Sequence, residues 1–125
     1  MKHRPRFDLF FFLLFVVFAC GKSLPEIKGF DREVWKNDQN GCASKRLPLS
    51  DAVLATKDKL LGFGEMDIVA VLGNPDQQEL YSRNQKFYRY YLEPNGKCIG
   101  VTSAHPKMLV VRFNAVGLAK EINLE

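Results

Sequence analysis

The first 20 residues restrict what this chain can fold into more than any other segment does. Lys2, Arg4 and Arg6 are followed by an uninterrupted apolar run, Leu9–Ala19, which ends in a small residue. A basic start, an apolar core of about 7–15 residues and a small residue before the cleavage point are typical of a secretory signal peptide. We therefore predict a leader over residues 1–19. It leaves about 106 residues to fold, which is enough for one domain with one modest core.

The cysteine at position 20 makes this leader more specific. Its last residues, Val17-Phe18-Ala19-Cys20, resemble the lipobox at the end of a bacterial lipoprotein signal. The resemblance implies that Cys20 is acylated, with palmitate among its chains, and becomes the mature N-terminus. An ordinary secreted protein and a retained anchor are the alternatives, although a transmembrane helix needs about 20 apolar residues and this run is shorter. We predict an exported protein that is held on a membrane by lipid.

The leader contributes half of the net charge of +4, through Lys2, Arg4 and Arg6 against Asp8. Residues 20–125 carry 15 Lys and Arg against 13 Asp and Glu, and the two signs are interspersed. There is no block of Lys and Arg of the kind that follows a phosphate backbone. Both the charge and the export signal therefore argue against a nucleic-acid partner.

Two cysteines, Cys42 and Cys98, remain once Cys20 carries lipid. In an oxidising compartment a disulfide is the default state of such a pair. The bridge would close a long loop, which is worth on the order of 4 kcal/mol in the chain-entropy model. Two free buried thiols are the alternative. A metal site is disfavoured because no histidine lies close to Cys42 in the sequence.

The mature chain divides into a tether and a domain. Residues 20–34, punctuated by Pro25 and Gly29, are predicted to be the lipidated N-terminus and a tether. Residues 35–125 are predicted to form the domain. Its first part, residues 35–49, is polar and turn-rich, so we expect an irregular segment that Trp35 and Cys42 fix to the core.

Two short helices are predicted between Ser50 and Gly73. Ser50 is a suitable N-cap for the first helix, whose apolar residues recur on one side, and Gly62 ends it. Gly64 can cap the second helix. Gly73 ends that helix in a left-handed conformation, and Pro75 prevents its continuation.

Beyond Pro75 the sequence predicts only strands and turns. Segments rich in aromatic and β-branched residues predict strands at residues 79–82, 86–92, 107–114 and 118–124. Tight reversals such as Pro94-Asn95-Gly96 favour antiparallel neighbours. We therefore predict an α+β fold, in which a two-helix hairpin packs on one face of a three- to four-stranded antiparallel meander sheet.

The helix and turn motifs carry a family resemblance. Leu61-Gly62-Phe63-Gly64, Asp67-Ile68-Val69 and Val71–Asp76, followed by an aromatic strand and Leu109–Asn114, resemble the SmpA/OmlA (BamE-like) small outer-membrane lipoproteins over about residues 55–124. The resemblance implies a helix-on-sheet interaction module, in one case an accessory subunit of the outer-membrane β-barrel assembly machinery. It also implies an outer-membrane location that faces the periplasm.

One segment departs from that family. The stretch Trp-x-x-Asp-x-x-Gly-Cys, formed by Trp35, Asp38, Gly41 and Cys42, is closer to that of other small lipoproteins.

An enzymatic function has little support in the sequence. His105 is the only histidine of the mature chain and lies in a predicted loop, where no neighbour in the sequence would orient it as a general base. Ser103 does not lie in a nucleophile elbow. We expect no catalytic residue, no cofactor and no metal.

Two functions of different classes remain. The first is an accessory or scaffold lipoprotein that binds another envelope protein, for example in outer-membrane assembly. The second is an inhibitor or sensor module of the same fold, which binds an envelope enzyme or a ligand. A structural lipoprotein without a specific partner is a third alternative.

The alternation of side chains along the predicted strands indicates where a partner would bind. The alternating set without arginine is the natural core, because burying an unpaired guanidinium is costly. Aromatic, Met and Arg side chains are enriched at protein interfaces. The predicted partner-binding face therefore consists of Phe87, Arg89, Tyr91, Met108, Val110 and Arg112. The alternative is that the tether or the segment around Trp35 folds over this face.

Overall fold

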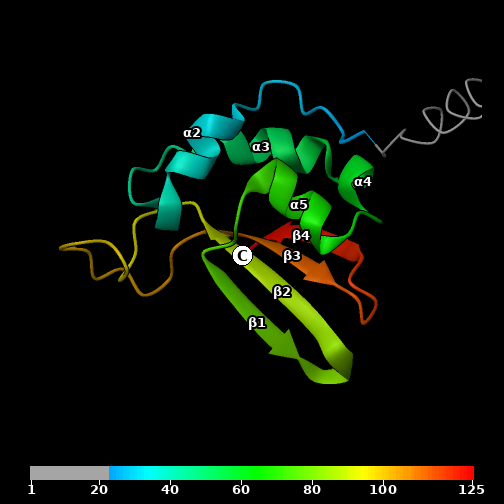
Figure 1. The fold of residues 1–125 in the computed structure, drawn as a ribbon. Coiled ribbons are helices and arrows are strands. Elements are labelled where there is room, and N and C mark those ends of the chain that lie inside the picture. The colour runs from blue at the N-terminus through cyan, green and yellow to red at the C-terminus, as the bar shows by residue number, and fades with distance from the viewer. Residues whose placement is uncertain (1–22) are drawn as a thin grey trace, which may run out of the picture.

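A four-stranded antiparallel sheet lies below a layer of helices that covers one of its faces (Figure 1). The computed structural model describes residues 23–125, so the predicted leader and Cys20 lie outside the described residues. The strand order follows the sequence, and each strand is antiparallel to the next. The strands are β1 (Gln77–Tyr81), β2 (Gln85–Tyr91), β3 (Met108–Phe113) and β4 (Ala119–Leu124). The predicted α+β meander is thus confirmed.

The helical layer contains more elements than the sequence predicts. The described α-helices are α2 (Arg32–Asn37), α3 (Leu47–Ala55), α4 (Lys57–Leu60) and α5 (Glu65–Leu72). A single-turn 3₁₀ helix, η2 (Gln39–Gly41), follows α2, and a second one, η3 (Ser82–Asn84), joins β1 to β2 outside this layer. The helices α3 and α5 correspond to the two predicted helices. By contrast, α2 and η2 lie in segments that were expected to be tether and irregular chain.

The first predicted helix starts earlier than expected and is divided. It begins at Leu47 with Pro48 in the first turn, where the fixed φ of proline favours a helix start. Ser50 is therefore not the N-cap but lies inside α3, and its hydroxyl donates to the carbonyl of Leu47 at 2.6 Å. Thr56, with φ −106° and ψ 3°, separates α3 from α4.

The second predicted helix has the expected ends. Gly64 is the N-cap of α5 in an extended conformation, and Gly73 is its C-cap. Gly73 has φ +77° and ψ −178°, a region that is essentially restricted to glycine. The positive φ was predicted, whereas ψ differs from that of a left-handed helical residue. The chain then turns at Pro75 into β1.

The predicted tether is shorter than residues 20–34. Ile27 is buried, and Leu24 and Phe30 pack against the core. Asp31 then caps α2 by accepting hydrogen bonds from the N–H groups of Glu33 and Val34. These apolar contacts and the cap attach the chain to the domain from Leu24 onward.

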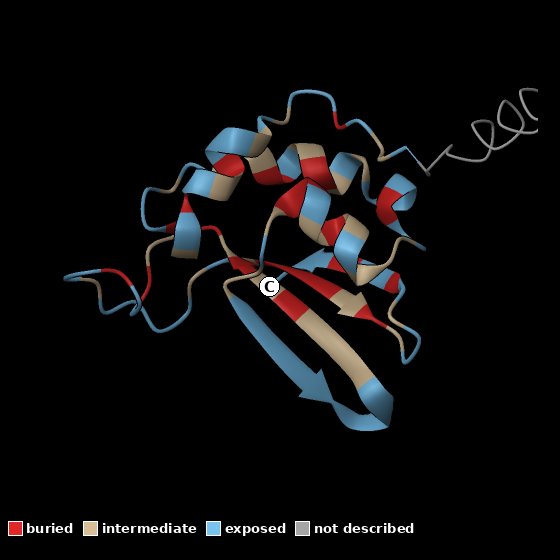
Figure 2. Ribbon diagram, viewed as in Figure 1, coloured by how far each residue is buried: buried red, intermediate tan, exposed pale blue. Residues whose placement is uncertain are grey.

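Trp35 lies at the centre of the contact between helices and sheet. Its side chain is fully buried, its indole N–H donates to the carbonyl of Leu72 at 2.9 Å, and its ring centroid lies 6.0 Å from that of Tyr90. Figure 2 shows buried residues where the helices face β2, β3 and β4, whereas β1 is exposed along its length. The core of the domain is therefore confined to the helix side of the sheet.

Glu65 joins the start of α5 to β2. Its carboxylate accepts hydrogen bonds from the Lys86 ammonium at 2.7 Å and from the Tyr88 hydroxyl at 2.9 Å. The hydrogen bond from Lys86 is the main cause that lowers the pKa of Glu65 below its ordinary value. Burial, followed by the hydrogen bond to Glu65, raises the pKa of Tyr88 to about 12.

We predict that Glu65 makes stability depend on pH in the acidic range. Because its pKa is lower in the folded chain than its ordinary value of 4.5, its stabilisation is complete above that value and is lost as the pH falls through the folded pKa. Urea unfolding should show that the wild type is more stable than Glu65→Gln at neutral pH, and that the difference disappears in acid. The control Asp58→Asn, on the exposed surface of α4, should give no such convergence. A constant separation of the Glu65→Gln and wild-type curves would contradict the assignment.

Candidate functional site

The six residues predicted to bind a partner form three neighbouring cross-strand pairs. In the register of β2 and β3, Phe87 lies opposite Arg112, Arg89 opposite Val110, and Tyr91 opposite Met108. Alternation places all six on the face of the sheet that the helices do not cover. We call this surface, formed by Phe87, Arg89, Tyr91, Met108, Val110 and Arg112, the outer face.

The outer face is less apolar than the sequence predicts. Five of its six residues are partly exposed, but Val110 is only 4% exposed. Val110 lies between Arg89 on β2 and Asn123 on β4 in the register of the sheet. Long side chains such as arginine can cover a short apolar neighbour while their charged ends stay in water. Val110 is therefore buried beneath the neighbouring side chains. The prediction that it is an exposed contact residue is wrong.

Ion pairs hold both arginines of the outer face in place. Arg89 pairs with Glu79 of β1, and its guanidinium lies 5.4 Å from the centroid of the Phe87 ring. Arg112 pairs with Glu121 of β4 at 3.0 Å and lowers the pKa of that carboxyl. The two guanidinium groups are thereby oriented along the sheet.

Neither the tether nor the Trp35 segment covers the outer face. Trp35, Ile27 and Phe30 all pack into the cluster of core residues on the helix side. Figure 1 shows the chain before α2 running over the helices, on the side away from the outer face. The alternative that these segments fold over the outer face is therefore excluded for the described residues.

A disulfide fixes one end of the outer face. Cys42, which follows η2, is bonded to Cys98 in the loop between β2 and β3, and their Cα atoms are 5.6 Å apart. This confirms the predicted bridge. The same loop is held by Asn95, which is 3% exposed and whose amide donates to the carbonyl of Asn40 at 2.7 Å.

A buried ion pair that the sequence did not suggest lies beside this bridge. Arg46 is 1% exposed, and one of its terminal nitrogens lies 2.6 Å from Oδ2 of Asp76. Its Nε donates to the carbonyl of Trp35 at 2.8 Å. Asp76 in turn accepts from the N–H groups of Asn40 and Tyr91, at 3.0 and 2.8 Å. The pair thus ties the start of α3 to the entry of β1 and the end of β2.

The motif Trp-x-x-Asp-x-x-Gly-Cys has a structural role in this arrangement. Asp38 is buried and accepts hydrogen bonds from the N–H groups of Ala43, Lys45 and Arg46. Gly41 has φ +66°, and a Cβ there would lie 2.6 Å from the carbonyl oxygen of Tyr91. Since only glycine fits so close to β2, the motif shapes the segment that carries Cys42 to the disulfide.

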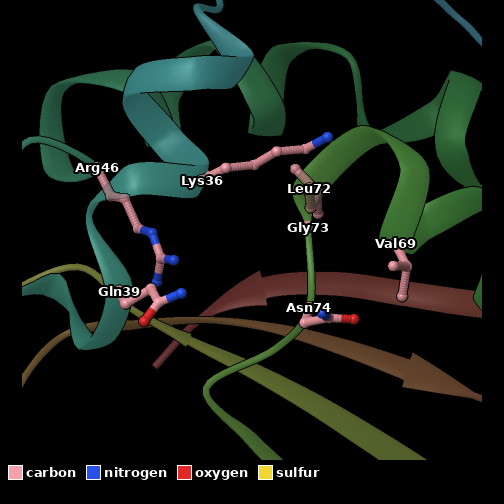
Figure 3. A pocket seen from close by; sticks show the side chains of 7 residues that line it. All are labelled: Lys36, Gln39, Arg46, Val69, Leu72, Gly73 and Asn74. Carbon is pink, nitrogen blue, oxygen red and sulfur yellow. The ribbon is translucent and has the colours of Figure 1, made fainter.

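A cavity of about 270 Å³ lies where α2 meets the end of α5. Figure 3 shows Lys36 reaching from α2 toward that end, while the guanidinium of Arg46 points toward Gln39. A Cβ on Gly73 would lie 3.0 Å from Cγ of Lys36, so the lysine stem packs directly on the cap. The buried charge in its lining, Arg46, is paired with Asp76. We interpret this cavity as part of the packing between helices.

A second cavity, of about 340 Å³, lies on the outer face. Its floor is formed by the predicted partner residues Arg89, Tyr91 and Met108 together with Gln77 of β1. The loop between β2 and β3 forms its wall, with Asn95, Gly96, Lys97, Ser103, Ala104 and Pro106. Sequence reasoning missed the wall, because a loop reveals its neighbours only once the disulfide places it. We take the outer face with this cavity as the candidate binding site.

No family model, curated protein or solved structure matches this chain. The resemblance to the SmpA/OmlA lipoproteins therefore remains a prediction. Within residues 23–125, no helix is both long and apolar enough to span a bilayer. The same residues contain no group of three or more His, Cys, Asp or Glu side chains arranged to hold a metal ion.

The disulfide predicts a specific loss of stability. Replacing Cys42 and Cys98 together with Ser should lower the free energy of unfolding by about 4 kcal/mol, since a long loop is no longer closed in the unfolded chain. Chemical unfolding of the wild type and the double variant measures this difference. Intact-mass analysis after alkylation provides the control, because the wild type should gain no alkyl group at either position without reductant. Alkylation of both thiols would contradict the bridge.

Removing one partner of the buried ion pair should reduce the free energy of unfolding more than replacing both partners with apolar residues. Asp76→Ala leaves Arg46 buried and unpaired, so we expect a loss of about 3–5 kcal/mol in unfolding free energy. The double variant Arg46→Met, Asp76→Leu should recover part of that loss. Glu121→Gln, which breaks a surface pair, is the matched control and should change stability far less. Equal effects of Asp76→Ala and Glu121→Gln would show that the buried pair has no special role.

Proposed function

We propose that this chain is an exported lipoprotein, anchored through Cys20, that acts as a protein-interaction or accessory module in the cell envelope. Its partner is another envelope protein, and the resemblance to the SmpA/OmlA family favours an outer-membrane location and a role in outer-membrane assembly. The domain is held on the membrane by lipid and contributes binding rather than catalysis.

The observation that carries this proposal is the open outer face. The helices and the N-terminal segment are packed on the opposite side of the sheet, while Phe87, Arg89, Tyr91 and Met108 remain partly exposed. Aromatic, Met and Arg side chains are the types enriched at protein interfaces. An uncovered apolar and cationic surface of this composition is typical of a binding site.

The position of the N-terminal segment supports the same function. Leu24 and Ile27 already pack against the core, so few residues separate the domain from Cys20. The three Cα–Cα steps from Cys20 to Ser23 can span at most about 11 Å. The described chain before α2 runs over the helix side (Figure 1), so it leaves the outer face accessible to a second protein.

The first test concerns the anchor. Replacing Cys20 with Ser should abolish fatty-acid incorporation and release the protein from the membrane fraction, because stable anchoring depends on the acyl chains. Expression in a host that processes lipoproteins, followed by fractionation and mass spectrometry of the N-terminus, measures both effects. Ser23→Ala is the control, since it changes an exposed residue near Cys20 without removing the acylation site. Unchanged acylation and membrane association of Cys20→Ser would overturn the anchor.

The second test concerns the outer face. After in-cell crosslinking, an envelope protein should co-purify with the wild type and be lost with the double variant Arg89→Ala, Tyr91→Ala. The melting temperature should stay within a few degrees, because both residues are partly exposed. The control Lys57→Ala, Met66→Ala changes exposed residues of the helical layer and should retain the partner. Retention of the partner by the outer-face variant would contradict this surface, and a soluble enzyme as the captured protein would instead favour the inhibitor function.

A further inference from the structure

The cavity on the outer face is built from two parts of the chain that the disulfide holds together. Arg89, Tyr91 and Met108 of the sheet form its floor, and the loop that follows β2 forms its wall. Cys98 in this loop forms the disulfide with Cys42, and the side-chain amide of Asn95 donates a hydrogen bond to the carbonyl of Asn40. Both attachments lead to the segment around η2. The part of the wall formed by Asn95, Gly96 and Lys97 is therefore held in position before any ligand arrives, which reduces the entropy lost on binding.

The charged side chains that line the cavity all have the same sign. Of its ten lining residues only Arg89 and Lys97 are charged, and both are positive. The Lys97 ammonium donates to the carbonyl of Asp76 at 3.1 Å and lies 5.2 Å from the centroid of the Tyr91 ring. These contacts direct the cation toward the sheet, next to the floor of the cavity.

Both cations keep hydrogen-bond capacity for a ligand. A guanidinium has five N–H donors and an ammonium has three. Among the described residues, Arg89 uses one terminal nitrogen on Glu79, and Lys97 uses one donor on a backbone carbonyl. The amide of Gln77 and the hydroxyl of Ser103 add polar groups to the lining. Such a set suits an anion that accepts several hydrogen bonds.

Most of the remaining lining is apolar, and a volume of about 340 Å³ has room for a side chain. Tyr91, Met108, Ala104 and Pro106 contribute rings, methyl and methylene groups. A carboxylate on a short hydrocarbon stem, as in glutamate or aspartate, would place its stem against these groups and its oxygens near Arg89 and Lys97. Since β1 is exposed at the edge of the sheet beside the cavity, the polypeptide that carries the carboxylate has room to lie alongside.

We propose that this cavity binds a carboxylate side chain from an acidic segment of the partner protein. The proposal rests on the proposed function, since it names the chemistry that the outer face recognises. Charge complementarity selects an acidic segment, and the apolar lining requires a carboxylate carried on carbon.

The direct test uses an acidic peptide as the probe. The full-length chain, purified in a neutral detergent, is titrated with fluorescein-labelled hexaglutamate, and anisotropy measures binding. Hexaglutamate should bind at low salt and weaken strongly at about 500 mM salt, because exposed charges are screened there. Labelled hexalysine should not bind. Absence of hexaglutamate binding at low salt would overturn the proposal.

A matched pair of loop variants tests the location. Ser103 lines the cavity, whereas its neighbour Thr102 does not, and both are exposed. Ser103→Glu places a carboxylate at the cavity and should weaken hexaglutamate binding about tenfold, while Thr102→Glu makes the same charge change and should stay within about twofold. Both variants are on the surface, so the melting temperature should not change. Equal weakening by the two variants would show that net charge alone attracts the peptide, and would overturn the cavity.

A second pair tests the cation. Lys97→Gln should weaken hexaglutamate binding about fivefold or more, and Lys107→Gln, which removes an exposed lysine outside the lining, should change it little. Equal effects of the two substitutions would again overturn the assignment.

The proposed function fails separately, when no envelope protein co-purifies with the wild type. A partner that is retained by Ser103→Glu and lost with Arg89→Ala, Tyr91→Ala would keep the outer face and overturn only the carboxylate site.

Discussion

The buried pair of Arg46 and Asp76 is the interaction on which the rest of the structure depends. It joins the start of α3 to the entry of β1, and its two side chains also bond to the backbone of Trp35, Asn40 and Tyr91. In residues 23–125 no buried side-chain nitrogen or oxygen lacks a hydrogen-bond partner. Because a buried charge is stable only while its partners are in place, this pair requires the helical layer, the η2 segment and the sheet to come together in one arrangement.

The same arrangement explains why one face of the sheet is open. On β2 and β3, the alternate set of side chains that contains no arginine packs beneath α5 and around Trp35. The alternate side chains, with Arg89 and Arg112, must then lie on the other face, since a strand directs successive residues to opposite sides. On that face Arg89 pairs with Glu79 of the edge strand β1, and Arg112 pairs with Glu121 of the edge strand β4. The result is a surface of aromatic, apolar and cationic groups that no described segment covers.

The disulfide turns this open sheet face into a shaped site. The long loop between β2 and β3 forms the wall of a cavity at the end of the sheet. Cys98 and Asn95 hold it against the segment that the motif residues Asp38 and Gly41 shape. No residue of the motif lines the cavity. The segment that the motif shapes nevertheless holds the loop beside Arg89 and Tyr91. A structural motif on the helix side therefore determines the form of the candidate binding site on the other side.

The sequence by itself determined the features that depend on local chemistry. Gly64 and Gly73 mark the two ends of α5, the alternation in β2 separates core from surface, and Cys42 and Cys98 are the one pairing left once Cys20 is predicted to carry lipid. Only the tertiary structure decided the burial of Arg46 and Val110, the packing of the segment from Leu24 onward, and the wall of the cavity. These features depend on partners far along the chain: Asp76 is 30 residues from Arg46, and Asn95 is 55 residues from Asn40. Capping and alternation act within a few residues, whereas the environment of a buried charge exists only after distant segments have met.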